Sequence, residues 1–176
     1  EVEGSFKNEN ISDKEFSAFK SGWLSNMNGE YNIEKEILEI CENKLRELEK
    51  INIKVEDIKP KINNDFLWGS WTTLRAKSIY EDTLAMNISD IDSMTYQAIW
   101  EYKKGQEINS EDLQLAIDQK QKCLNQIDSI FGNFDFLALP SAQIFPFDKN
   151  LQFPTSINSI ELDTYHRWLE VFILSS

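Results

Sequence analysis

The segment from Asn109 to Pro140 constrains the fold most, because a long amphipathic helix is followed there by a short apolar strand. Asn109 or Ser110 is expected to cap this helix, and two acidic residues follow at the positive end of its dipole. Gly132 is expected to end it. The predicted buried stripe consists of Leu113, Ala116, Ile117, Leu124, Ile127 and Ile130. The apolar run 136–139 then predicts a strand that stops at Pro140.

The chain before this segment alternates in the same way. Strands are predicted at 18–24 and 51–58, because short apolar runs alternate there with polar residues. A helix is predicted between them, with Asn32 as its cap and a buried stripe of Ile33, Ile37, Ile40, Cys41, Leu45, Leu48 and Ile51. This alternation of strands and helices favours an α/β fold, or an α+β fold with few strands. We expect 53–58 and 136–139 to share one sheet, with the helix 110–131 packed on it.

Two further helices are predicted between the second and third strands. One covers about 65–85 and carries Trp68 and Trp71. The other begins near Ser89 and runs to Lys104, with Gly105 as its C-terminal stop. Trp68 and Trp71 are expected to pack in the core, although they could also line a cavity.

Charge and composition exclude several classes of function. The formal net charge is −12, with 30 acidic and 18 basic residues, so neither nucleic acid nor an anionic membrane surface is an expected partner. No apolar run is long enough to span a membrane, and a cytoplasmic location is expected. Cys41 and Cys123 are expected to be buried free thiols. No metal site is expected, because His166 is the only histidine.

Common catalytic motifs are absent from the sequence. It contains no G-x-S-x-G elbow, no phosphate loop and no dinucleotide fingerprint, and its six glycines are isolated. Ser141 could be a nucleophile, but no base neighbours it in sequence. The many carboxylates fit an acidic surface better than a paired-carboxylate hydrolase.

Two stretches of the later chain resemble one known family. "FDFLALPSAQIFPFD" and "LQFPTSINSIELDTYHRWLEV" resemble the later part of amidase signature enzymes, which carry a "YDxLxxPTAxxxPF" strand and turn and a "DTYxRW"-like segment. The resemblance extends back through Trp100-Glu101 and "WGSWTTLRA" to "SGWLSNMNG". It implies a few strands of a mixed sheet with several packed helices, as part of that family's fold.

The resemblance implies amide C–N hydrolysis by a Ser–cis-Ser–Lys triad without a cofactor. The family's lysine and Gly-Gly-Ser-Ser-Gly loop precede the matched region, so no residue here is assigned a catalytic role. The chain is expected to be a single partial domain, 1–176, with 1–17 as a loose lead-in. Taken alone, it is expected to be inactive. We also expect it to self-associate or to need the missing segments, because the apolar residues 169–174 would lack cover.

The residues expected to contact the substrate are Gln143, Phe145, Phe147 and Trp168, although packing roles are an alternative. In glutamine-handling members of the family, a carboxylate stands at the place of Trp168, so a small-molecule amide with an apolar or aromatic group is favoured here. His166 is not expected to be a general base. Asp163 and Arg167 are expected to form a helix-surface ion pair worth about 0.3–0.5 kcal/mol. Two hypotheses remain: a portion of an amidase that supplies pocket wall and scaffold, or a non-catalytic amidase-like interaction module.

Overall fold

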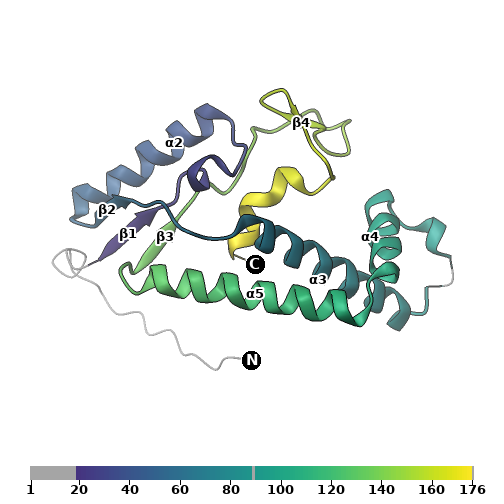
Figure 1. Cartoon of the computed structure of the whole chain (residues 1–176). Helices are drawn as coiled ribbons and strands as arrows, with labels where there is room; N and C mark the ends of the chain where they lie inside the picture. The colour runs from purple at the N-terminus through teal and green to yellow at the C-terminus, as the bar shows by residue number, and fades with distance from the viewer. Residues whose placement is uncertain (1–18, 89, 176) are drawn as a thin grey trace, which may run out of the picture.

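The computed structural model describes residues 19–88 and 90–175, and these form a mixed α/β fold (Figure 1). The expected lead-in 1–17 lies outside the described residues. The strands are β1 (Lys20–Trp23), β2 (Lys54–Asp57), β3 (Phe136–Ala138), β4 (Ser156–Ile157) and β5 (Ile160–Glu161). The α-helices are α2 (Lys35–Arg46), α3 (Asn64–Ala85), α4 (Tyr96–Glu107) and α5 (Ser110–Phe131). Four 3-10 helices complete the order: η1 (Met27–Gly29), η2 (Glu47–Ile51), η3 (Ile91–Ser93) and η4 (Arg167–Ser175).

The first three strands form one parallel sheet in the order β2-β1-β3. The prediction that 53–58 and 136–139 share a sheet is therefore confirmed, with β1 between them. Gly22 lies in the central strand, where a Cβ would meet Ile58 Cδ1 at 2.8 Å and Leu137 Cδ2 at 3.1 Å. A glycine here lets the neighbouring side chains close over the middle of the sheet. Strands β4 and β5 form a separate antiparallel pair.

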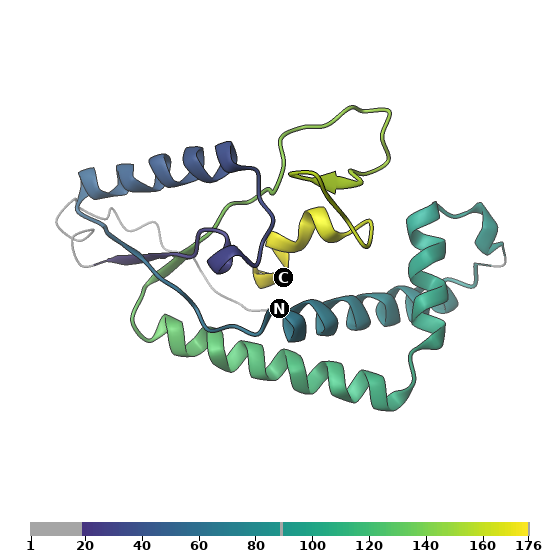
Figure 2. The same ribbon diagram turned by 45° about the horizontal axis from the view of Figure 1, so that its top comes forward.

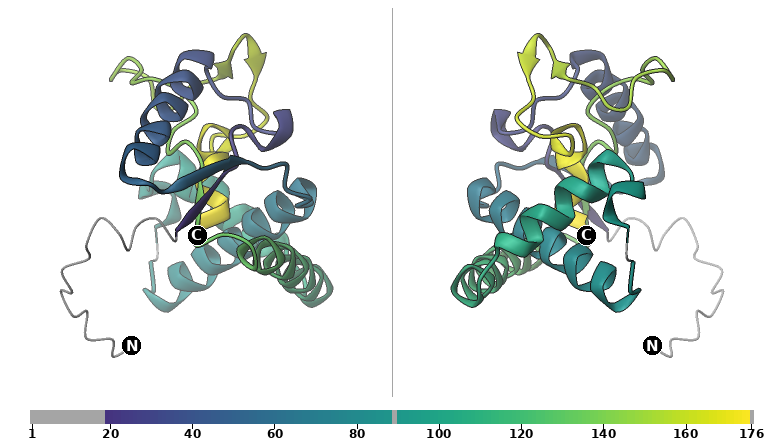
Figure 3. Two further views of the ribbon diagram at one scale, coloured as in Figure 1. Left: turned by 90° about the vertical axis from the view of Figure 1, so that its left-hand side faces the viewer. Right: turned by 90° about the vertical axis from the view of Figure 1, so that its right-hand side faces the viewer.

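Helix α2 packs over the sheet through the first hydrophobic core. Its Ile37 is buried with Leu24, Tyr31 and Val171, and Leu137 and Leu139 of the β3 region pack against them. Figure 3 shows α2 on one side of the sheet and the long helices on the other. The helix is shorter than predicted, because residues 47–51 tighten into η2. Ile40 is 52% exposed and so lies outside the buried stripe.

The predicted cap of α2 is wrong. Glu34 occupies the N-cap position and makes no side-chain cap hydrogen bond. Asn32 instead bonds the β4–β5 hairpin: its Nδ2 donates to Ile157 O at 2.8 Å, and its Oδ1 accepts from Asn158 Nδ2 at 2.8 Å. The side-chain amide of Asn32 therefore bonds a hairpin distant in the sequence and does not cap the helix.

Helix α5 begins as predicted but packs differently. Asn109 and Asp112 form a reciprocal capping box, and Gly132 caps the C-terminus. Its principal packing partner is α3, which lies beside it in Figures 1 and 2, and not the sheet. The buried residues of α5 are Ala116 and Cys123, whereas Ile117 is 46% exposed. The expected packing of 110–131 on the sheet is therefore wrong.

Helix α4 crosses the far end of α3, and Gly105 is where they meet. The predicted stop at Gly105 is wrong, because α4 continues to Glu107 with Gly105 buried inside it. A Cβ at this glycine would collide with Ala76 O and stand 2.5 Å from Tyr80 Cβ. The absence of a side chain thus permits a close helix crossing. The predicted start near Ser89 is also wrong, since η3 comes first and Thr95 caps α4.

The C-terminal helix η4 joins two hydrophobic cores. Val171 belongs to the core under α2, and Ile173 belongs to a second core with Leu67 of α3 and Cys123 of α5. Both are buried, at 2% and 4% exposure. The expectation that this apolar segment lacks cover is therefore wrong for these two residues, although Phe172 is 44% exposed. Cys123 is buried and Cys41 is half-buried, and both are free thiols.

A helix that crosses a bilayer must be both long and apolar. No helix in the described part of the chain meets both requirements.

Candidate functional site

The "DTYHRW" segment, residues 163–168, distributes its side chains among three neighbouring places. Asp163 and Arg167 line an open cleft. Tyr165 and His166 enter a buried cluster around Glu101. Trp168 contacts Phe147 beyond the end of β3. This one short segment therefore reaches the cleft, the Glu101 cluster and the Phe147 ring.

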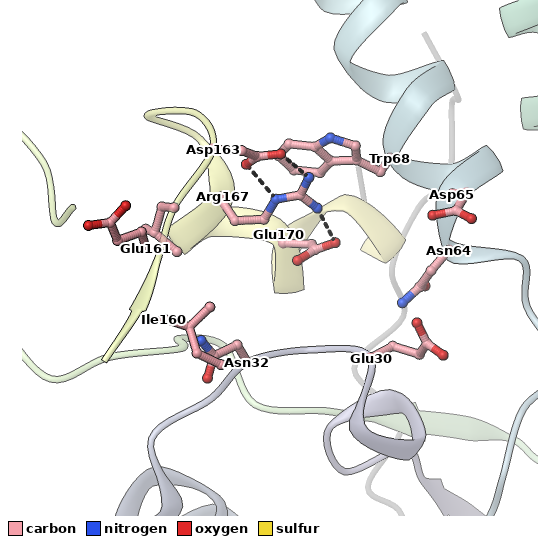
Figure 4. A pocket seen from close by; sticks show the side chains of 11 residues that line it. Glu30, Asn32, Asn64, Asp65, Trp68, Ile160, Glu161, Asp163, Arg167 and Glu170 are labelled. Atoms are coloured by element: carbon pink, nitrogen blue, oxygen red, sulfur yellow. Dashed lines mark hydrogen bonds and ion pairs between the residues drawn. The ribbon is translucent and has the colours of Figure 1, made fainter. Parts of the chain in front are cut away.

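The cleft has a volume of about 390 Å³ and lies between η1, α3, β5 and η4 (Figure 4). Its acidic lining residues are Glu30, Asp65, Glu161, Asp163 and Glu170. The other lining residues are Asn32, Asn64, Trp68, Ile160, Leu162 and Arg167. The cleft is thus lined by five carboxylates and one cation.

Each of the three guanidinium nitrogens of Arg167 donates to a carboxylate of this chain. Its Nε and Nη2 donate to Asp163 at 2.9 and 2.7 Å, and its Nη1 donates to Glu170 at 2.8 Å. Its guanidinium carbon lies 3.6 Å from the ring centre of Trp68, a cation–π arrangement visible in Figure 4. The predicted pair with Asp163 is present. It is not a helix-surface pair, however, because the Arg167 side chain is only 25% exposed and covers an indole.

Glu170 is the most buried carboxylate of the cleft, with its side chain 10% exposed. Burial raises the pKa of Glu170, and the nearby charges of Asp163 and Glu30 raise it further, while Arg167 opposes them. The net shift is upward, so desolvation outweighs the ion pair. Only Oε1 has a partner among the described residues.

A second cluster is centred on Glu101 of α4, which is 1% exposed. Its Oε1 accepts from Arg75 Nε at 2.7 Å and from the Tyr165 hydroxyl at 2.8 Å, and it lies 2.7 Å from His166 Nε2. Its Oε2 is buried and has no partner among the described residues. This carboxylate joins α3, α4 and the turn before η4 through one oxygen.

The protonation of this cluster follows from its hydrogen bonds. Burial alone would raise the pKa of Glu101, but hydrogen bonds from His166, Tyr165 and Arg75 outweigh it and hold the pKa below its usual value. Burial, with the hydrogen bond to Glu101, raises the pKa of Tyr165 to about 12. His166 stacks on Tyr165 at 3.9 Å and meets the edges or faces of Trp68, Trp71 and Trp100 at 5.3 to 6.2 Å. These contacts give His166 a packing role, at 1% exposure.

Gln143 holds the turn after β3 in place. It is 1% exposed. Its Nε2 donates to Asn32 O at 3.1 Å, and its Oε1 accepts from Val171 N at 3.1 Å. Both ends of the amide are thus used between the start of α2 and η4.

Phe145 and Phe147 are exposed, and Trp168 is half-buried. Phe145 is 45% and Phe147 36% exposed, and the backbone N of Phe145 donates to Glu34 Oε2 at 3.0 Å. The rings of Phe147 and Trp168 meet edge-on, with centroids 5.4 Å apart. Parallel strands place their carboxyl ends at one edge of a sheet, where ligands bind in many α/β folds. Substrate contact by these residues stays a prediction.

Ser141, which has no neighbouring base in the sequence, is exposed. Within residues 19–88 and 90–175, no group of three or more His, Cys, Asp or Glu side chains could hold a metal ion.

Sequence reasoning missed Glu101, Arg75 and Glu170. Glu101 and Gly105 are four residues apart and so fall on one face of α4, which is its buried face. An acidic residue beside a glycine on one helix face could have indicated a buried carboxylate. Glu170 follows Arg167 by three residues, a spacing that permits an ion pair. Arg75 gave no signal, because its partner Glu101 lies 26 residues away.

Comparisons with known proteins identify the fold. No protein-family model matches this sequence, and a search of curated proteins finds no match. Among solved structures, a bacterial aryl acylamidase of the amidase signature enzymes matches with a TM-score of 0.75 and 15% sequence identity, over 88% of this chain and 34% of that one. A second amidase structure matches with a TM-score of 0.73 and 12% identity, over 89% of this chain and 36% of the other.

This protein therefore has a portion of an amidase-type α/β fold. It corresponds to about a third of the length of each of those two chains. The family resemblance noted in the sequence is supported at the level of the fold.

Proposed function

We propose that this chain forms the substrate-contacting wall and scaffold of an amide hydrolase, whose nucleophile and base come from outside these 176 residues. The observation that carries the proposal is the contact between Trp168 and Phe147 of the segment that follows β3, in a fold shared with two amidases. Partly accessible aromatic rings suit the apolar or aromatic substituent of a small amide.

The proposal assigns different roles to the four candidate residues. Phe145, Phe147 and Trp168 would select the substituent, since their rings are partly accessible. Gln143 would position them, because its side chain joins the turn after β3 to η4. The Glu101 cluster would hold Tyr165 and His166, and through them the adjoining Trp168.

The chemistry itself would need the rest of an active site. No residue of the sequence matches the serines, lysine or glycine-rich loop implied by the family resemblance. The loss of a single oxyanion donor costs about 10²–10³ in rate. Without nucleophile, base and oxyanion loop, residues 1–176 alone are expected to give no turnover above background.

The test is Trp168→Ala in the complete reading frame, if that frame encodes a lysine and a glycine–serine loop before Glu1. We expect the ratio of kcat/KM for aryl over short alkyl amides to fall by about tenfold, the contribution of one well-packed aromatic contact. Phe131→Ala is the matched control, since Phe131 is 46% exposed at the end of α5. An unchanged ratio in Trp168→Ala would leave Trp168 a packing residue. A frame without the lysine and loop would favour the non-catalytic module.

A further inference from the structure

Another hollow lies between α3, α5 and η4, and its lining differs from that of the acidic cleft. Figures 1 and 2 show α3 and α5 side by side, with η4 beside the start of α3. The hollow has a volume of about 210 Å³. Its lining residues are Leu67, Ser70, Trp71, Leu74 and Arg75 of α3, Lys120 of α5 and Ile173 of η4. We call it the α3–α5 pocket.

The spacing of residues in α3 explains why one helix supplies most of this lining. Positions 67, 71, 74 and 75 follow the order i, i+4, i+7 and i+8, so their side chains lie on one face of the helix. The first three of these are apolar. Leu67 and Ile173 belong to the second hydrophobic core, and Trp71 packs against it. The pocket is therefore an apolar hollow at the edge of that core.

Both charged residues of the lining are cations. They are Arg75 and Lys120, and no carboxylate is among the described residues that line the pocket. This contrasts with the whole chain, in which 30 acidic residues outnumber 18 basic ones. A ligand with a negative charge is therefore favoured here over a neutral or positive one.

Arg75 is held in position and still has donors to offer. Its Nε donates to Glu101 Oε1 at 2.7 Å, and its guanidinium carbon lies 5.4 Å from the ring centre of Trp71. The Arg75 side chain is nevertheless 42% exposed. Because a guanidinium has more N–H donors than these contacts use, donors remain for a ligand. Their planar fork matches the geometry of a carboxylate.

Lys120 supplies the positive charge that Glu101 does not neutralise. It is exposed, and its ammonium forms no ion pair or hydrogen bond with a described residue. The two cations of the pocket are thus in contact with a single carboxylate, that of Glu101. One positive charge is left for a ligand.

The volume and the lining together limit the class of ligand. An apolar protein cavity of about 150 Å³ holds a benzene ring. The α3–α5 pocket, at about 210 Å³, has room for such a ring with one small substituent. The indole of Trp71 favours an aromatic ligand, because aromatic rings attract one another edge to face or offset.

We infer that the α3–α5 pocket binds a small aryl carboxylate. The carboxylate accepts hydrogen bonds from Arg75 and Lys120, and the ring packs between the apolar face of α3 and Ile173. Glu101 is the positioning residue for Arg75. The pocket shares no lining residue with the Phe147–Trp168 contact, so its occupation does not depend on the proposed amide hydrolysis.

Calorimetry on the 176-residue chain tests the inference with benzoate as the probe. Benzamide is the neutral counterpart, and acetate carries the charge without the ring. We expect one benzoate site with a Kd of about 1 mM, given the size of the probe. Benzamide and acetate should each bind more weakly by about tenfold or more, because each lacks one of the two interactions.

Each comparison can overturn one part of the argument. Benzamide binding as tight as that of benzoate would overturn the charge argument. Acetate binding as tight as that of benzoate would leave only diffuse attraction of anions and would overturn the pocket. N-acetylphenylalanine, added in a parallel arm, mimics the C-terminus of a peptide, and tighter binding of this mimic would overturn the small-molecule assignment.

Two substitutions remove the cations one at a time. Arg75→Gln should weaken benzoate binding by about tenfold or more, because a charged fork of donors is lost. Lys120→Gln, at an exposed position, should weaken it by about threefold. Lys122→Gln is the matched control, since Lys122 is exposed on the same helix and does not line the pocket. It should bind as the parent does, and equal weakening by Lys120→Gln and Lys122→Gln would overturn the site.

Amide NMR spectra establish that each variant keeps the parent fold and also locate the ligand. Shift changes on benzoate addition should gather at residues 67–75 and around Lys120 and Ile173. Shift changes centred on Phe147 and Trp168 would place benzoate at the proposed substrate wall and overturn the assignment. If Arg75→Gln does not fold, Lys120→Gln and the benzamide comparison still decide the inference.

Discussion

Replacing Glu101 by glutamine is the sharpest test of how the late turn is held in place. One buried oxygen of Glu101 is bonded to Arg75, Tyr165 and His166. Hydrogen bonds to a charged group contribute about 1.5–3 kcal/mol each, and neutral ones about half as much. The amide keeps the shape but loses the charge, and it puts a donor where Oε2 now has no partner.

The expected loss in free energy of unfolding is about 2–4 kcal/mol at pH 7. The estimate is below three full charged bonds, because Arg75 is 42% exposed and can rehydrate. Urea unfolding followed by tryptophan fluorescence measures the loss. Glu107→Gln is the matched control on the same helix, where an exposed pair with Lys104 should contribute less than about 0.5 kcal/mol.

The loss should also depend on pH. The pKa of Glu101 is lowered in the folded state, so its stabilisation is present above the unfolded pKa of about 4.3 and disappears as pH falls through the folded value. Parent and Glu101→Gln should therefore converge in stability below about pH 4. A difference under about 0.5 kcal/mol at pH 7, or one that grows on acidification, would refute the reasoning.

Three further outcomes are expected from thermal or urea unfolding. Gly105→Ala should lower the free energy of unfolding by about 1–3 kcal/mol, because the new methyl group overpacks against α3. Gly69→Ala should raise it by up to about 1 kcal/mol, since the nearest atom to a Cβ there is Gln119 Oε1 at 3.8 Å. A change of the same sign in both variants would contradict the close crossing of α3 and α4. Asn109→Ala should cost about 1 kcal/mol by removing the capping box of α5, and the exposed mid-helix change Asn125→Ala should cost less. The pKa of Glu170 is raised in the folded state, so its contribution to stability is present below the unfolded pKa and is lost as pH rises through the folded pKa. Glu170→Gln should therefore be more stable than the parent at pH 8, and this difference should disappear near pH 4.

The sequence by itself determined the elements whose signals are local. The capping box at Asn109, the Gly132 end of α5 and the β3 strand before Pro140 all depend on residues within one turn or one run of the chain. The three strands of the sheet were found for the same reason, since alternation of apolar residues or a short apolar run is visible along the chain without the partner strand. The mixed α/β class followed from that order.

Only the tertiary structure decided what the side chains contact. Asn32 had the character of a helix cap, but a hairpin 125 residues later uses its amide. Gly105 had the character of a helix stop, but α3 approaches it too closely for any side chain. Arg75 and Glu101 lie 26 residues apart in the sequence, and only the fold brings the Arg75 guanidinium to the buried Oε1 of Glu101. Propensity and periodicity report on neighbours along the chain, whereas these roles come from contacts between segments that only folding brings together.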